Sequence, residues 1–228
     1  LFDAGSLTKV LNEREQFGIK HIFITHAHLD HIIGIPFLAD NIIMKKKTHN
    51  VNVISIPPVI KTIKKNLFNS SVWPDFTVIP DPCNAVLFLV EIHEGKPQHV
   101  DGYIVTPYRV NHSVPAVGYL IEDTRKKKLF YTGDTGPTGT TWKKIGNRQL
   151  DCMIIEVSFP NRLREMALMT GHLTPKMLEG ELIQLEHMPE RIYVTHPKPQ
   201  HFAIIKREIE RLKIRNLRLL REGEVLRI

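Results

Sequence analysis

Short runs of apolar residues recur along the chain and predict β-strands. These runs are rich in Val, Ile, Phe and Tyr, and polar or turn-forming residues bound them. They lie at residues 21–25, 51–56, 85–92, 103–110, 116–121, 128–133, 152–158, 191–195 and 224–228. Several are apolar almost throughout, which is typical of strands buried on both faces of a sheet.

Three segments between these runs have the periodicity of amphipathic helices: residues 57–68, 174–188 and 199–213. The first begins with proline, which suits a first helical turn, and the second begins with Thr174 as an N-cap before Pro175. The predicted inward faces are Val59, Ile60, Ile63 and Leu67 in the first helix and Phe202, Ile205, Ile209 and Leu212 in the third. Strands flanked by helices predict one layered domain over residues 1–228, and the pattern leaves open whether it has one sheet or two.

Composition allows one sizeable core, because the chain has 228 residues of which 42% are hydrophobic. The net charge of +7 suits a polyanionic or phosphate-bearing ligand, but it serves solubility equally well. The basic runs at 45–47 and 125–128 lie between apolar segments, so we expect solvated turns there.

Two distant cysteines predict neither a disulfide framework nor a zinc ribbon. No window approaches the roughly 20 apolar residues of a membrane span.

The chain opens at "LFDAGS" without a methionine. We therefore expect a fragment or a processed form in which N-terminal strands are missing. We predict a cytoplasmic location, with the periplasm as the alternative because a signal peptide could have been lost.

A dense polar cluster follows the first predicted strand. The stretch "FITHAHLDHIIG", residues 23–34, puts three histidines and an aspartate into six positions directly behind an apolar run. Turns prefer Gly, Asn, Asp, Ser and Pro, so three imidazoles have no reason to be there as turn residues. The pattern predicts a metal site.

Further candidate donors also lie at the ends of predicted elements. They are His112 after residues 103–110, Asp134 after 128–133, His196 after 191–195 and His172 before 174–188. Several strand ends that each deliver an imidazole or a carboxylate are typical of a site at one edge of a sheet. We expect His21, His49, His93 and His187 to be inert, whereas His99 and His201 lie near site segments and stay open.

The donor types favour more than one metal ion. Three neutral imidazoles suit zinc and leave a fourth position for water. Residues two apart in an extended segment point the same way, so His26 and His28 can bind one ion together. Asp30 and His31 then face a second position. Six or seven nitrogen and oxygen ligands are too many for one tetrahedral ion and suit two, with Asp134 as the natural bridging carboxylate.

The motif HxHxDH after a buried strand, followed by Gly34, resembles the metallo-β-lactamase superfamily. The resemblance runs from "LFDAG" at 1–5 through "GD" at 133–134 to "TH" at 195–196, and so covers nearly the whole chain. It implies an α+β fold, the four-layer αβ/βα sandwich known as the metallo-β-lactamase fold, with a dinuclear site along the shared sheet edge.

The resemblance also implies a division of the ligands between two divalent ions, with Zn²⁺ expected first and Mn²⁺ or Fe²⁺ as alternatives. The implied sets are His26, His28 and His112 for the first metal, Asp30, His31 and His196 for the second, and Asp134 as the bridge.

Further motifs narrow the subfamily. The true β-lactamases lack the second histidine of the DH pair, so His31 argues against them. "HAHLDH" with "NHSVPAVGYLI" (111–121), "YTGDTGPT" (131–138), "IIEVSFPN" (154–161), "GHLTP" (171–175) and "YVTHPKP" (193–199) is similar to class II cyclic-nucleotide phosphodiesterases. These matches occur in the right order, which is more specific than any one alone.

This resemblance implies hydrolysis of 3′,5′-cyclic nucleotides, cAMP or cGMP, by a hydroxide held between two metals. Asp30 counts among the catalytic residues, since with Asp134 it sets the charge of the metal centre. We expect His172 to protonate the leaving 3′-oxygen and Glu156 to orient it. The expected partner is a small nucleotide rather than a membrane, and a homodimer is an open option.

Three alternatives remain. The tRNA 3′-processing endonucleases (tRNase Z) share the metal ligands, and Glu156 and His172 match a glutamate and a histidine in them; the +7 charge slightly favours such a nucleic-acid enzyme. However, no long Gly/Pro-tipped basic arm of the tRNase Z kind is evident. A metal-free binding module and a hydrolase of esters or thioesters on the same scaffold are the other two.

Overall fold

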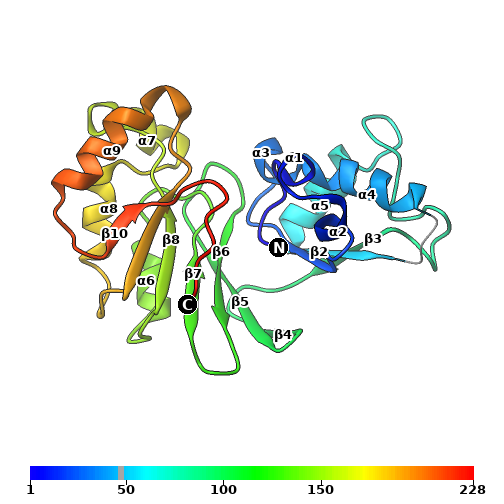
Figure 1. Cartoon of the computed structure of the whole chain (residues 1–228), viewed down its shortest axis with the longest axis horizontal. Coiled ribbons are helices and arrows are strands. Elements are labelled where there is room, and N and C mark those ends of the chain that lie inside the picture. Colours follow the sequence, from blue (N-terminus) through cyan, green and yellow to red (C-terminus); the bar gives the residue numbers. More distant parts are fainter. Residues whose placement is uncertain (46–48) are drawn as a thin grey trace. The chain divides into compact units, whose positions relative to one another are not determined.

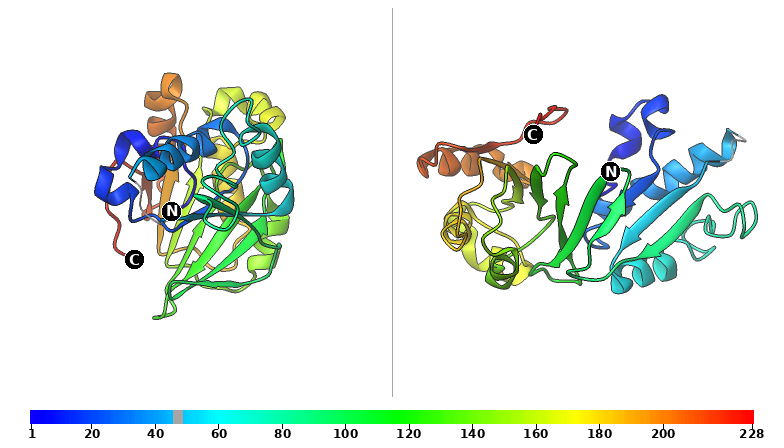
Figure 2. Two further views of the ribbon diagram at one scale, coloured as in Figure 1. Left: turned by 90° about the vertical axis from the view of Figure 1, so that its right-hand side faces the viewer. Right: turned by 90° about the horizontal axis from the view of Figure 1, so that it is seen from below.

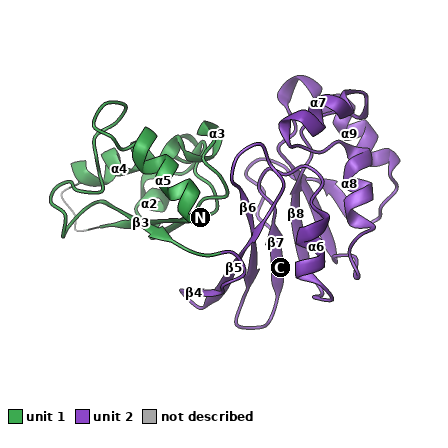
Figure 3. Cartoon of the chain, turned by 180° about the vertical axis from the view of Figure 1, so that it is seen from behind, with its two compact units in different colours: residues 1–93 green, residues 94–228 purple. Residues whose placement is uncertain are grey.

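The structure, a computed structural model, describes residues 1–45 and 49–228 (Figure 1). Contacts divide the chain into two compact units, residues 1–93 and residues 94–228, which Figure 3 colours separately. Lys46 and Lys47 of the predicted basic turn lie outside the described residues. The prediction of a single domain stays a prediction.

Unit 1, residues 1–93, is built on a small parallel sheet. Its elements are α1 (Leu7–Val10), α2 (Glu13–Gln16), β1 (His21–Phe23), α3 (Leu29–Ile32), α4 (Gly34–Met44), β2 (Val51–Ser55), α5 (Pro57–Asn66) and β3 (Leu87–Glu91). The strands pair in the order β1-β2-β3, all parallel. The chain moves from β1 to β2 to β3 in one direction along the sheet. Right-handed connections between these strands therefore place α4 and α5 on the same face (Figure 1).

The sequence explains these elements. Val59, Ile60 and Ile63 of α5 and Leu67 at its C-cap are all buried, which confirms that helical face. We did not predict α4; its Pro36 lies in the first turn, where a backbone N–H is not needed. Ile22, Ile24 and Val53 of the strand region are fully buried, as expected for a parallel sheet.

Unit 2, residues 94–228, contains a mixed sheet. Its elements are β4 (Gln98–Val100), β5 (Tyr103–Arg109), β6 (Val117–Glu122), β7 (Lys128–Tyr131), α6 (Gly139–Ile145), β8 (Cys152–Glu156), η1 (Asn161–Leu163), α7 (Arg164–Thr170), α8 (Pro175–Leu182), β9 (Arg191–Thr195), η2 (Pro199–His201), α9 (Phe202–Arg211) and β10 (Leu217–Leu219). The strand order is β10-β9-β8-β7-β6-β5-β4. Strands β4 to β7 form an antiparallel meander, and β7 to β10 are parallel.

Helices cover one face of this sheet. Connections β7-α6-β8, β8-α8-β9 and β9-α9-β10 all progress in one direction, so the helices lie on the same side (Figures 1 and 2). The core beneath them includes Phe130, Met153 and Ile192 from strands, Trp142 from α6 and Leu178 from α8. This packing holds the strands in place, and with them the loops that follow their carboxyl ends.

Several predicted elements need correction. Residues 224–228 form no strand, because Val225 is 86% exposed and the segment has no apolar face to bury. Instead β10 lies at 217–219, where the arginine in "LRL" obscured the strand pattern. Phe202 is exposed rather than inward, since the packed face of α9 begins at Ile205. Strand β4 and the short helices α1, α2, α3, α6 and α7 were not predicted.

Helices among residues 1–45 and 49–228 are all too short or too polar to cross a lipid bilayer.

Candidate metal centre

The HxHxDH motif of unit 1 forms the turn between β1 and α3. The chain leaves β1 at Phe23, bends at Thr25, and enters α3 at Leu29 after His28, whose backbone is extended. Asp30 and His31 therefore lie in the first turn of α3. The first residues of the chain hold this turn, because Ala4 N donates to His31 O at 2.7 Å and Gly34 N donates to Ala4 O at 2.7 Å.

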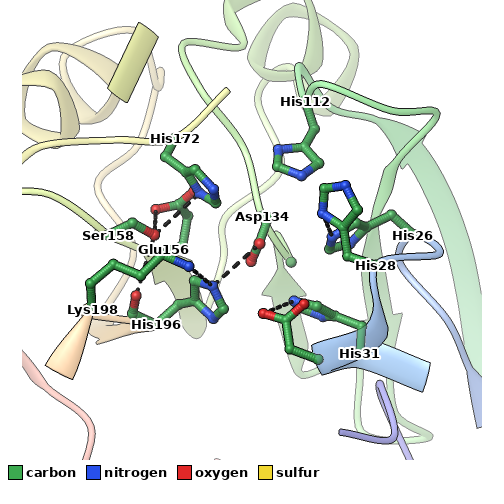
Figure 4. Close-up of polar contacts among 12 residues, drawn as sticks. His26, His28, His31, His112, Asp134, Glu156, Ser158, His172, His196 and Lys198 are labelled. Carbon is green, nitrogen blue, oxygen red and sulfur yellow. Dashed lines mark hydrogen bonds and ion pairs between the residues drawn. The ribbon is translucent and has the colours of Figure 1, made fainter. Parts of the chain in front are cut away.

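Within unit 1 the donor atoms of the motif converge. His26 Nε2 and His28 Nδ1 lie 3.0 Å apart. Figure 4 draws these two side chains next to each other. The rings of His26 and His31 have centroids 4.1 Å apart, and His31 Nε2 is 3.8 Å from Asp30 Oδ2. The separation of His26 Nε2 and His28 Nδ1 is that of a hydrogen bond between the two rings, whose donor depends on their tautomers. Imidazole nitrogens gathered in this way are also the ligand type that zinc prefers.

Asp3 is a functional candidate that the sequence reasoning missed. Its Oδ2 accepts a hydrogen bond from His31 Nδ1 at 2.8 Å, and its Oδ1 accepts from Thr25 N at 2.8 Å. A carboxylate on Nδ1 fixes the tautomer and leaves the lone pair of a neutral ring on Nε2, as in metal-binding histidines. The signal was present in "LFDAG", which was matched only as a strand-and-turn motif.

In unit 2 the candidate donors come from one edge of the sheet. Strands β7, β8 and β9 are parallel neighbours, and β5 runs in the same direction because two antiparallel steps separate it from β7. Their carboxyl ends lead to His112 after β5, Asp134 after β7, Glu156 at the end of β8 and His196 after β9. The fold therefore gathers residues separated by more than 80 positions in sequence.

Contacts within unit 2 orient these side chains. Asp134 Oδ2 lies 3.4 Å from His196 Nε2. His112 Nδ1 donates to Gly171 O at 2.8 Å, which leaves the lone pair of a neutral His112 ring on Nε2. The rings of His172 and His196 are stacked with an angle of 15° and a centroid distance of 5.9 Å.

Glu156 and His172 form a buried acid–imidazole pair. His172 Nδ1 lies 2.6 Å from Glu156 Oε1, and Ser158 Oγ donates to Glu156 Oε2 at 2.9 Å (Figure 4). Burial raises the pKa of Glu156 above its usual range, against the opposing effect of the His172 hydrogen bond. Burial opposes protonation of His172, but the hydrogen bond and the charge of Glu156 outweigh it and raise the pKa of His172.

The donor set of each unit fits divalent metal ions. Unit 1 supplies His26, His28, Asp30 and His31, and unit 2 supplies His112, Asp134 and His196. Imidazole nitrogen and carboxylate oxygen are the usual ligands of zinc and of similar ions. Also within unit 2, donor atoms of Asp134, Glu156 and His172 all lie within 4.8 Å of one another.

Comparison with known proteins identifies the family. The model of the "Beta-lactamase superfamily domain" matches residues 3–196. A "Probable 3′,5′-cyclic-nucleotide phosphodiesterase" of Yersinia pestis is 30% identical over 206 residues, which cover 79% of this chain and 57% of that protein. A "Ribonuclease Z" of Archaeoglobus fulgidus is 25% identical over 248 residues, 86% of this chain and 76% of that protein. The chain thus spans less than two thirds of the Yersinia protein.

The fold is shared with a solved structure. Unliganded yeast PDE1 superimposes with a TM-score of 0.80 over 96% of this chain and 72% of that chain, at 23% sequence identity. These findings confirm both the predicted fold class and the resemblance on which it was based. The chain belongs to the beta-lactamase superfamily and has the metallo-β-lactamase fold.

Proposed function

We propose that the chain is a metal-dependent phosphodiesterase that hydrolyses 3′,5′-cyclic nucleotides. The observation that supports it most is the buried Glu156–His172 pair beside Asp134, because such a pair can supply the proton that a phosphoester leaving group needs. The Yersinia protein, which is named as a probable enzyme of this class, supports the choice of substrate.

Two divalent ions, zinc or alternatively manganese or iron, are part of this proposal. The residues that would hold them are His26, His28, Asp30, His31, His112, Asp134 and His196. When bound, such ions activate a water molecule and offset the negative charge of the phosphate. Asp3 and Gly171 would fix the His31 and His112 rings with Nε2 presented to the ions.

The residues of the pair have distinct tasks in this proposal. His172, with a pKa raised by Glu156, retains a proton that its Nε2 can donate to the leaving 3′-oxygen. Glu156 keeps that ring oriented through its 2.6 Å contact with Nδ1. Ser158, which bonds the second oxygen of Glu156, keeps the carboxylate from rotating.

Hydrolysis of 3′,5′-cyclic AMP by the zinc- or manganese-loaded protein tests this proposal. We expect Asp134→Ala to abolish turnover, because it removes a metal ligand. We expect His172→Ala to lower kcat by about 100-fold or more while metal content stays unchanged, since positioned general acids contribute about 10²–10⁴. The matched control is His187→Ala, because His187 is an exposed histidine of unit 2. This variant should be as active as the wild type.

A tRNase Z-like 3′-processing nuclease is the second candidate, and two observations favour it: the +7 charge and the Archaeoglobus relative. Wild-type protein with intact metal content that cleaves a tRNA precursor and not cyclic AMP would replace the first proposal by the second. Salt separates the two classes, because a nuclease that neutralises several phosphates loses affinity steeply as salt rises. If esters or thioesters are the preferred substrates, both phosphodiester proposals are wrong.

A further inference from the structure

Lys198 lies beside the predicted metal ligand His196. Its Nζ is 3.4 Å from His196 Nε2, the same nitrogen that lies 3.4 Å from Asp134 Oδ2 (Figure 4). His196 is thus contacted at one atom by an anionic and a cationic group. Nε2 is also the atom that would bind a metal. The ammonium group of Lys198 would therefore lie next to the position of the metal ion.

A sharp backbone turn precedes Lys198. His196 has a φ of 63°, in the left-handed region, so the chain turns sharply as it leaves β9. Ser158 contacts both sides of this turn: its Oγ lies 3.2 Å from His196 O, and its O accepts from Lys198 N at 3.2 Å. Ser158 also contacts Glu156, so the turn is attached to the acid–imidazole pair.

The surroundings of Lys198 favour an anion as its partner. Its ammonium group lies next to His196 Nε2, an atom that the proposed function assigns to a divalent cation. A lysine side chain near a cluster that would bind two cations is repelled by them, unless a negatively charged ligand lies between the groups. An ammonium group is a common partner of phosphate, for which it acts as a point charge.

We propose that Lys198 binds a phosphoryl oxygen of the substrate and thereby selects anionic phosphoesters over neutral esters. This inference rests on the proposed function in that it assigns a substrate contact at the same centre. Lys198 would contact a non-bridging oxygen directly, while His172 serves the leaving group.

Binding of inorganic phosphate to the metal-loaded protein tests this role without any turnover. We expect Lys198→Met to weaken phosphate binding by about 10- to 100-fold, the loss typical of one hydrogen bond to a charged group. Lys198→Arg keeps the charge and should recover much of the affinity. Lys206→Met, which removes an exposed lysine of α9, is the control and should bind like the wild type.

Two further measurements separate a substrate contact from a structural role. Metal content and melting temperature should be the same in Lys198→Met and the wild type. With a phosphodiester and a neutral ester of the same leaving group as substrates, the variant should lose kcat/KM for the phosphodiester alone.

Phosphate binding to Lys198→Met with wild-type affinity would overturn the proposal, as would a wild-type protein that holds metal but binds no phosphate. A protein that binds phosphate through Lys198 but leaves cyclic AMP intact would contradict the proposed function and still support this contact.

Discussion

Neighbouring groups determine which ring nitrogen a candidate histidine presents for metal binding. Asp3 accepts a hydrogen bond from Nδ1 of His31, and the Gly171 carbonyl accepts one from Nδ1 of His112. Both neutral rings therefore present Nε2. The motif predicted which residues are candidate donors, but not which ring nitrogen each histidine would present. That choice depends on residues far apart in sequence, such as Asp3 and His31, and only the fold brings these together.

Asp151 provides a residue-scale prediction about stability. Its carboxylate accepts hydrogen bonds from Lys127 Nζ and from Lys128 N, the latter at 2.8 Å. Burial would raise the pKa of Asp151, but these hydrogen bonds outweigh it and the pKa is lowered. We expect Asp151→Asn to lower the free energy of unfolding by about 1 kcal/mol at pH 7, because Lys127 is partly exposed and water screens the pair.

The sign of the pH dependence follows from the lowered pKa. Since the folded-state pKa lies below the ordinary value of about 3.9, the contribution is present above about pH 4 and is lost as pH falls through the folded-state pKa. Thermal unfolding from pH 3 to pH 7 should therefore show wild type and Asp151→Asn converging at the acidic end. A constant difference at every pH would show that the charge of Asp151 is irrelevant.

At the scale of elements, strand ends place the candidate site. The sequence predicted eight of the strands with small errors at their ends, since buried strands have a strong apolar signal. It also predicted the donors at the ends of these strands. The pairing order and the number of sheets were not predictable, because they depend on contacts between strands that periodicity does not encode. Short helices such as α6 and α7 were missed because their few turns have weak periodicity.

Gly171 links α7 to the loop that carries His112, and it supports an element-scale prediction. Its φ is +71°, and an added Cβ would lie 2.9 Å from His112 Cα and 2.9 Å from Ser113 N. We expect Gly171→Ala to cost about 1–2 kcal/mol for the left-handed backbone and about 1–3 kcal/mol for crowding. It should also weaken metal binding, measured by competition with a chelator, because His112 is displaced.

Gly95→Ala is the matched control for this prediction. Gly95 has the same φ of +71°, but nothing lies within 4 Å of its added Cβ. This variant should show only the backbone cost and keep its metal affinity. Equal behaviour of the two variants would show that the approach of Gly171 to His112 is unimportant.

For the whole molecule, the proposed metal centre draws donors from both compact units. His26, His28, Asp30 and His31 belong to unit 1, and the other three ligands belong to unit 2. If all seven bind the same ions, metal binding should stabilise the entire chain rather than one unit. The predicted cytoplasmic location and the homodimer option are matters of the whole molecule too, and they stay predictions.

Metal removal tests this shared centre. Ions present at about 1,000 times their dissociation constant add about 4 kcal/mol of stability, so a chelator should lower the melting temperature by several degrees. His26→Ala in unit 1 and His196→Ala in unit 2 should each reduce the metal content below two ions and remove most of that stabilisation. His187→Ala should keep the full effect. Two ions retained in both ligand variants would disprove the shared centre.

The antiparallel connection from β6 to β7 in unit 2 has a practical consequence. Because β5, β7, β8 and β9 all end at the edge that carries the donors, the hairpin between β6 and β7 lies at the opposite edge of that sheet. Its residues Thr124, Arg125 and Lys126 are exposed. A fluorescent label, an affinity tag or a surface tether attached there would leave the histidines undisturbed.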